Sequence, residues 1–177
     1  MDMRKFKNSE LDRKTMGEYK NAKKSPFVVV LDNVRSLNNI GSLFRTSDAF
    51  LVEAIYLCGI TATPPHKDIH KTALGATESV DWAYFKTTEE AIFTLKNRDY
   101  LIISIEQAEE AIPLRDFCVN RKQKYALVFG HEVKGVSQKI IDVSDACIEI
   151  PQFGTKHSFN IAVSAGIVLW EFYNKLQ

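Results

Sequence analysis

The stretch FVVVLDNVRSLNNIGSLFRTSDAF, residues 27–50, carries the pattern on which the fold prediction depends. Residues 27–32 are almost continuously apolar and rich in valine, which is typical of a strand covered on both faces. Wound as a helix, residues 40–51 place one apolar stripe on a single face, made of Ile40, Leu43, Phe44, Ser47, Phe50 and Leu51. A buried strand, a polar turn and an amphipathic helix are typical of a parallel α/β sheet.

The same alternation continues along the chain. Apolar runs predict further strands at 54–59, 80–85, 100–106, 125–130 and 147–150, of which 80–85 is the weakest pattern. Further helices are predicted at 87–97, with Thr88 as N-cap, at 137–144 and at 160–176. The last helix is apolar on nearly every side, so we expect it to be buried against the sheet, a second copy of the chain, or both. The prediction is one α/β domain with a mostly parallel sheet flanked by helices.

Length and composition are those of a single globular domain. A chain of 177 residues can bury about 70% of its unfolded surface. The start lacks an apolar leader and no apolar run approaches the roughly 18 residues that span a bilayer, so we expect no membrane association and a cytoplasmic location. The three cysteines, Cys58, Cys118 and Cys147, are far apart, which favours buried thiols in a reducing compartment.

Charge divides the chain near residue 24. Residues 1–24 hold eight Lys or Arg against four Asp or Glu, whereas residues 25–177 hold fifteen against eighteen. A basic arm therefore precedes a mildly acidic domain over residues 25–177. Two interpretations of the arm are open, namely a solvated and partly frayed terminus, or a segment that contacts phosphate.

Polar, glycine-containing turns follow three of the predicted strands, at 33–45, 131–137 and 151–160. Ligands bind beyond the carboxyl ends of parallel strands, so we expect these turns to meet at one edge of the sheet. Arg45 lies off the apolar stripe of its helix. Its guanidinium can pair with Asp48, or it can bind a phosphate or hydroxyl beside Asn39 and Gly41.

The other two turns also allow a structural or a functional interpretation. Gly130 is expected to adopt a positive φ or to admit a ligand against bare backbone. Glu132 is either an exposed turn residue or part of a site. Ser158 or Asn160 is expected to cap the terminal helix. A cap needs one polar side chain, however, and this turn also supplies Lys156 and His157.

Familiar phosphate-loop, dinucleotide, nucleophile-elbow and zinc-protease motifs are absent from the sequence. His66 and His70 stand four residues apart but lack a third ligand, so we predict no metal site.

The three turns, in this order, resemble the three motifs of the SpoU (TrmH-like) family of RNA ribose 2′-O-methyltransferases in the SPOUT superfamily. Asn39-x-Gly41-x-x-x-Arg45 resembles the first motif, LVFGHEVKGVS (127–137) the second, and IEIPQFGTKHSFNIAVSAGI (148–167) the third. KTALGA (71–76) and SIEQAEE (104–110) are also similar to the family, and the resemblance runs from about Phe27 to the C-terminus. Phe159 departs from the pattern, because the family usually has leucine there.

The resemblance implies an S-adenosylmethionine-dependent enzyme with a deep C-terminal trefoil knot that works as a homodimer on RNA, tRNA first. An rRNA enzyme and a catalytically silent RNA-binding protein of the same fold are the alternatives. It assigns cofactor contact to Glu106, Gly130, Ile150 and Phe159. It assigns catalysis to Asn39, Arg45, Glu132, Ser158 and Asn160, with Arg45 acting across the dimer, where the family often gives it the role of base. Because a guanidinium has no atom that accepts a proton, we expect Arg45 instead to act as a phosphate clamp and oxyanion stabiliser, with the substrate phosphate assisting proton removal. Substrate binding falls to the arm and to Arg35, Lys67 and Lys71.

Overall fold

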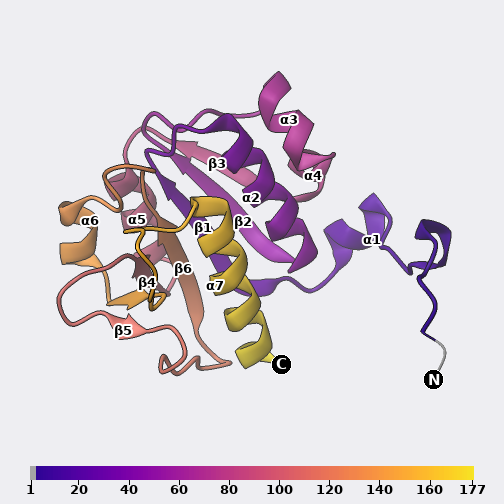
Figure 1. Cartoon of the computed structure of the whole chain (residues 1–177). Coiled ribbons are helices and arrows are strands. Elements are labelled where there is room, and N and C mark those ends of the chain that lie inside the picture. Colours follow the sequence, from indigo (N-terminus) through magenta and orange to yellow (C-terminus); the bar gives the residue numbers. More distant parts are fainter. Residues whose placement is uncertain (1–2) are drawn as a thin grey trace.

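The computed structural model describes residues 3–177 and contains one sheet flanked by helices (Figure 1). Within these residues seven strands follow the order β3-β2-β1-β6-β4-β7-β5, and all neighbouring pairs are parallel. The strands are β1 Ser25–Asp32, β2 Val52–Cys58, β3 Trp82–Phe85, β4 Tyr100–Ile105, β5 Ile112–Pro113, β6 Lys124–Phe129 and β7 Ala146–Glu149. The predicted mostly parallel sheet is confirmed, and only the two-residue β5 was not predicted.

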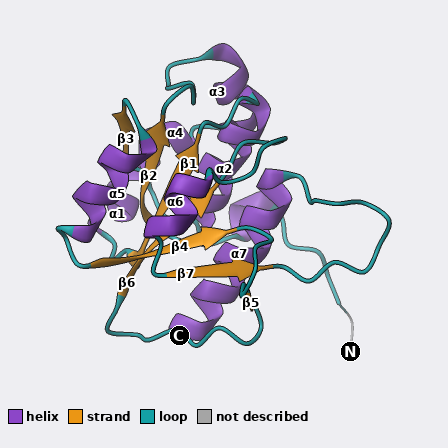
Figure 2. Cartoon of the chain, turned by 90° about the vertical axis from the view of Figure 1, so that its left-hand side faces the viewer, coloured by secondary structure: helices purple, strands orange, loops and turns teal. Residues whose placement is uncertain are grey.

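Helices cover both faces of the sheet (Figures 1 and 2). Their bounds are η1 Asn8–Glu10, a 3₁₀ turn, then α1 Met16–Asn21, α2 Leu37–Ala49, α3 Lys67–Ala73, α4 Ala76–Ser79, α5 Thr88–Lys96, α6 Gln138–Val143 and α7 Ile161–Leu176. Alternate residues of β1 divide the core in two. Phe27, Val29 and Leu31 pack on the side of α2 and α7, whereas Val28 and Val30 pack on the side of α5 and α6. All five are fully buried, as the continuous apolar run predicts.

Two helix starts differ from the prediction. α2 begins at Leu37, before the predicted position 40, because the Ser36 side chain caps it by accepting from the backbone N–H of Asn39. α5 is capped by Thr87 and not by Thr88. Thr88 is already helical, and its hydroxyl donates to the buried carboxylate of Asp32 at 2.6 Å.

The apolar stripe of α2 faces the core as predicted, with Ile40, Leu43, Phe44 and Ser47 buried and Phe50 partly buried. Gly41 lies against α3. A Cβ at this position would overlap the Thr72 hydroxyl and the Ile69 carbonyl, so glycine is required for the two helices to approach.

The N-terminal arm is packed against the domain by its helix. The Tyr19 side chain of α1 is 5% exposed and belongs to the main core cluster. Lys20 pairs with Asp81 at 2.5 Å, and Thr15 and Glu18 form a capping box at the start of α1.

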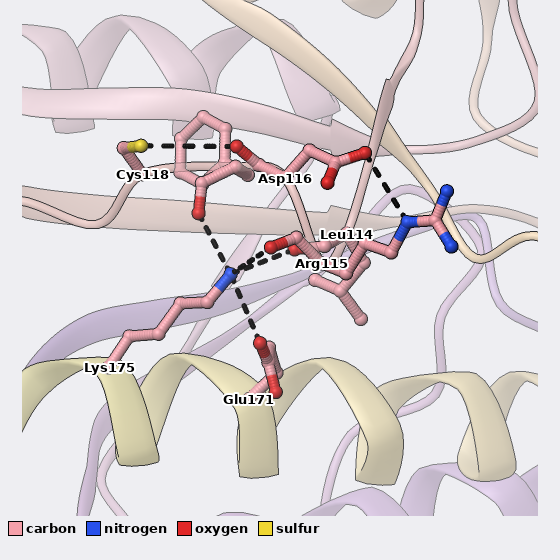
Figure 3. Close-up of polar contacts among 7 residues, drawn as sticks. Leu114, Arg115, Asp116, Cys118, Glu171 and Lys175 are labelled. Carbon is pink, nitrogen blue, oxygen red and sulfur yellow. Dashed lines mark hydrogen bonds and ion pairs between the residues drawn. The ribbon is translucent and has the colours of Figure 1, made fainter.

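The terminal helix α7 buries one face and exposes another. Ala165, Val168 and Phe172 are fully buried, whereas Val163 is 50% and Trp170 55% exposed. Near its end the Lys175 ammonium donates to the carbonyls of Leu114, Arg115 and Phe117 at 2.9–3.0 Å and pairs with Glu171 (Figure 3). This contact fastens the last turn of the helix to the segment between β5 and β6.

The cysteines differ in exposure. Cys58 is buried, which raises the pKa of its thiol to about 12. Cys147 is half-buried and Cys118 is exposed, so the prediction of a buried thiol is wrong for Cys118, which lies in the irregular segment after β5. Across residues 3–177 no helix has the length and apolar character needed to cross a membrane.

Candidate active site

Glu132 joins the three turns at the carboxyl ends of the strands. Its carboxylate accepts from the backbone N–H groups of Arg35 and Ser36 at 3.0 and 2.8 Å, and from the Asn39 amide at 3.3 Å. The Asn160 amide in turn donates to the Asn39 side-chain oxygen at 3.1 Å. The expectation that the turns at 33–45, 131–137 and 151–160 meet at one edge is therefore confirmed.

The environment of Glu132 keeps it ionised. Burial raises the pKa of the carboxyl, but the hydrogen bonds from the backbone N–H groups of Arg35, Ser36 and Glu132 and from the Asn39 amide together outweigh burial, and the net pKa lies below its ordinary value. Both carboxylate oxygens already accept hydrogen bonds, which makes the group a poor proton acceptor. Within this chain Glu132 has the geometry of a residue that positions Asn39.

The turn after β6 depends on its two glycines. His131 and Gly135 form a short antiparallel bridge with N–H to O distances of 3.0 and 2.8 Å. A Cβ on Gly130 would overlap the Gly135 backbone, and Gly135 has φ +67°. The expectation for Gly130 is therefore corrected in part, because the positive φ belongs to Gly135 and the backbone that approaches Gly130 is the chain's own.

Asn160 performs two tasks. Its side-chain oxygen accepts from the Ala162 N–H at 2.8 Å and caps α7, while its amide nitrogen bonds to Asn39. Ser158, two residues earlier, is exposed and free of the capping role. The cap prediction thus holds for Asn160 and leaves the Ser158 hydroxyl available.

A cavity of about 590 Å³ opens beside these groups at the ends of β4, β6 and β7. Seven of the residues predicted to serve the site line it: Glu106, Gly130, Glu132, Ile150, Ser158, Phe159 and Asn160. Its volume is in the range of small-molecule sites. The Gln107 amide, in the same lining, donates to the His157 carbonyl at 2.7 Å and ties the loop 151–160 to the end of β4.

The remaining predicted residues do not line this cavity. Arg45 is exposed and lines a second cavity, and it forms no ion pair with Asp48 in the described part of the chain. Asp48 accepts instead from the Ser79 hydroxyl at 2.5 Å. Lys67 and Lys71 are exposed on α3, and the Arg35 side chain is exposed at the turn after β1.

Asp32 is a site-building residue that the sequence analysis missed. It ends β1 and is 2% exposed, and its carboxylate accepts from the Thr88 hydroxyl and from the Ser137 N–H at 3.0 Å. It therefore ties β1 to the starts of α5 and α6. The signal in the sequence was an aspartate directly after a buried apolar run. A carboxylate buried there needs several hydrogen-bond donors, so it is expected to join other elements.

No group of three His, Cys, Asp or Glu side chains suited to a metal ion occurs in residues 3–177. His66 accepts from the Asp68 N–H at 3.2 Å and caps α3.

The fold and the site define a parallel α/β domain with a ligand-sized cavity at the carboxyl edge of its sheet. The sequence profile of the SpoU rRNA Methylase family matches residues 26–170, and the chain belongs to this family. It is 30% identical over 162 residues to a tRNA (guanosine(18)-2′-O)-methyltransferase of Aquifex aeolicus, covering 89% of this chain and 74% of that protein. It is 29% identical over 151 residues to a 23S rRNA (guanosine-2′-O-)-methyltransferase of Neisseria meningitidis, covering 85% and 59%.

The structure is also similar to solved structures. An AdoMet-bound rRNA methyltransferase from Sinorhizobium meliloti superposes with a TM-score of 0.80 at 26% identity, over 88% of this chain and 58% of that one. The chain thus spans less than two thirds of the length of the Neisseria and Sinorhizobium proteins.

Proposed function

We propose that the chain transfers a methyl group from S-adenosylmethionine to a ribose 2′-hydroxyl of RNA, most naturally of tRNA. The observation that carries the proposal is the hydrogen-bonded chain from Glu132 through Asn39 to Asn160, whose two ends line the 590 Å³ cavity. Relatives named as tRNA and rRNA 2′-O-methyltransferases support the reaction, and the Aquifex protein supports tRNA first. rRNA is the second candidate substrate because of the Neisseria protein.

The cavity residues suit S-adenosylmethionine, the ligand of the Sinorhizobium structure. Phe159, 42% exposed, offers an aromatic face to an adenine ring. Gly130 and Ile150 line the cavity at two strand ends. The Glu106 carboxylate is already held by the N–H groups of Gln107 and Val136, both at 2.9 Å, so we assign it a role in shaping the cavity.

When bound, S-adenosylmethionine supplies an electrophilic methyl group on a sulfonium. The chain's own task is to align the ribose hydroxyl and to help it lose its proton to the adjacent substrate phosphate, as the O–C bond forms and the sulfonium S–C bond breaks to leave S-adenosylhomocysteine. Arg45 is assigned the clamp on the adjacent phosphate and the stabilisation of the developing oxyanion, since a guanidinium donates hydrogen bonds in a fixed fork and has no acceptor atom for a proton. Ser158 and Asn160 are assigned the orientation of the hydroxyl.

We propose that the complete site forms in a homodimer. Arg45 and the Ser158–Asn160 turn line different cavities of one chain, so a second copy is needed to bring them together. The exposed apolar side chains of α7, Val163, Ile167 and Trp170, supply a surface for that copy.

The finer architecture is part of the same proposal. Membership of the SpoU family supports a C-terminal trefoil knot. Residues 25–177 form the methyltransferase domain and residues 1–24 an RNA-binding arm, with Arg35, Lys67 and Lys71 adding contacts to RNA. The proposed RNA substrate supports a cytoplasmic location.

Two measurements test the proposal. Calorimetry is expected to show saturable binding of S-adenosylmethionine, and nucleoside mapping of tRNA and rRNA from a deletion strain is expected to lack one 2′-O-methyl peak. Binding without a lost peak would favour the catalytically silent alternative. No binding at all would refute the proposed enzyme.

A further inference from the structure

A second cavity, of about 490 Å³, lies between the N-terminal arm and the domain. Three segments form its walls: residues 12–19 of the arm, α2 from Arg45 to the following turn, and the turn from α3 into α4 at 73–79. It shares no lining residue with the first cavity. Of the site residues predicted by number, Arg45 lines it, together with residues of the arm that was predicted to bind substrate.

The arm residues that line the cavity are held in place by contacts with the domain. Tyr19 anchors α1 in the core, and the Lys20–Asp81 pair ties the arm to the residues just after α4. Arg13 and Lys14 precede this anchor by a few residues, and their positions on the cavity wall follow from it. These two cations therefore face the same space as Arg45.

The cavity lining combines groups that suit a nucleotide. Among residues 3–177 none of its three cations, Arg13, Lys14 and Arg45, takes part in an ion pair. Guanidinium and ammonium groups without partners bind phosphate oxygens.

Carboxylates and apolar side chains complete the lining. The carboxylates are Asp12, Asp48 and Glu78, and the apolar side chains include Met16 and Leu74. Carboxylates repel a free phosphate, whereas the amino groups of a nucleobase and the hydroxyls of a ribose can donate hydrogen bonds to them. Leu74 is 66% exposed and gives a base an apolar surface.

We propose that this cavity receives an RNA nucleotide next to the methylated ribose, with its phosphate held between Arg13, Lys14 and Arg45. The inference rests on the proposed function and adds a specific place on the arm where the substrate strand is held. It makes the arm and the catalytic arginine two walls of one substrate site.

A matched pair of double variants tests the proposal. Arg13→Ala/Lys14→Ala removes two cavity cations, and Arg121→Ala/Lys122→Ala removes the same dipeptide from an exposed segment before β6 that lines neither cavity. All four side chains are exposed, so both variants are expected to fold, and thermal melting verifies this. The probe is bulk tRNA or rRNA from a deletion strain, whichever the wild-type chain methylates.

The cavity variant is expected to raise KM for RNA about tenfold or more, with S-adenosylmethionine affinity unchanged. The slope of log Kd for RNA against log salt is expected to fall by about 1.4 to 1.8, the value for two lost phosphate contacts. The control variant is expected to change KM by less than about twofold. Equal effects in the two variants would overturn the cavity proposal and leave the proposed function intact, whereas a wild-type chain that methylates no RNA would refute the proposed function itself.

Discussion

Replacing Glu132 by glutamine removes the negative charge that holds the three donors, while the side chain keeps its size and shape. The amide keeps one acceptor oxygen for the Arg35 or Ser36 N–H, while its NH₂ group faces the other backbone donor. One charge-assisted hydrogen bond is lost, which is worth about 1.5–3 kcal/mol, and the exposure of the side chain favours the lower end. At about 2–4 °C per kcal/mol for a chain of this size, the melting temperature is expected to fall by about 3–6 °C.

Thermal unfolding at neutral pH measures the loss, with Glu109→Gln as control, since Glu109 is exposed and accepts no hydrogen bond within the described residues. Because the folded pKa of Glu132 is lowered, its contribution is present above the unfolded value near 4.5 and is lost as pH falls through the lower folded pKa. The melting temperatures of the Glu132→Gln and Glu109→Gln variants are therefore expected to approach each other as the pH is lowered into the acid range. Melting within about 1 °C of the control at neutral pH would refute the positioning role.

Three further predictions test other parts of the molecule. Lys175→Met leaves three backbone carbonyls without their donor, and chemical denaturation is expected to show a loss of about 2–4 kcal/mol, against no loss for the exposed Lys139→Met. Gly41→Ala places a methyl group against Thr72 and Ile69 and is expected to cost about 1–3 kcal/mol. Gly17→Ala, in open space on α1, is expected to stabilise the protein by up to about 1 kcal/mol, and the same sign for both alanines would contradict the close α2–α3 packing. Arg45→Lys keeps the charge but not the bidentate fork, so kcat is expected to fall by about 100-fold with S-adenosylmethionine binding intact, and retention of most turnover would refute the phosphate clamp.

The strands and the edge that carries the site were predictable because both are local. Continuous apolar runs such as 27–32 identify buried strands, and the polar turns that follow parallel strands must share an edge. Strand order was not predictable, because the sequence of residues 146–149 contains no local pattern that specifies β4 and β5 as the neighbours of β7.

Other features depended on contacts between distant residues. In the sequence Tyr19 is one aromatic residue within a charged arm. Its burial depends on a surface formed by residues far along the chain. The same holds for Glu132, whose three donors lie more than ninety residues earlier in the sequence. Local pattern identified these residues as candidates and could not assign their partners.

The interior place of β7 has a consequence for biosynthesis. β7 is the last strand to leave the ribosome, yet it separates β4 from β5, and β5 reaches the sheet only through it. A nascent chain that ends before residue 146 therefore presents β4 as a bare edge, the kind of surface that pairs with other chains. Stalled or truncated translation products of this protein are expected to be the aggregating species, while the released chain closes its own edge.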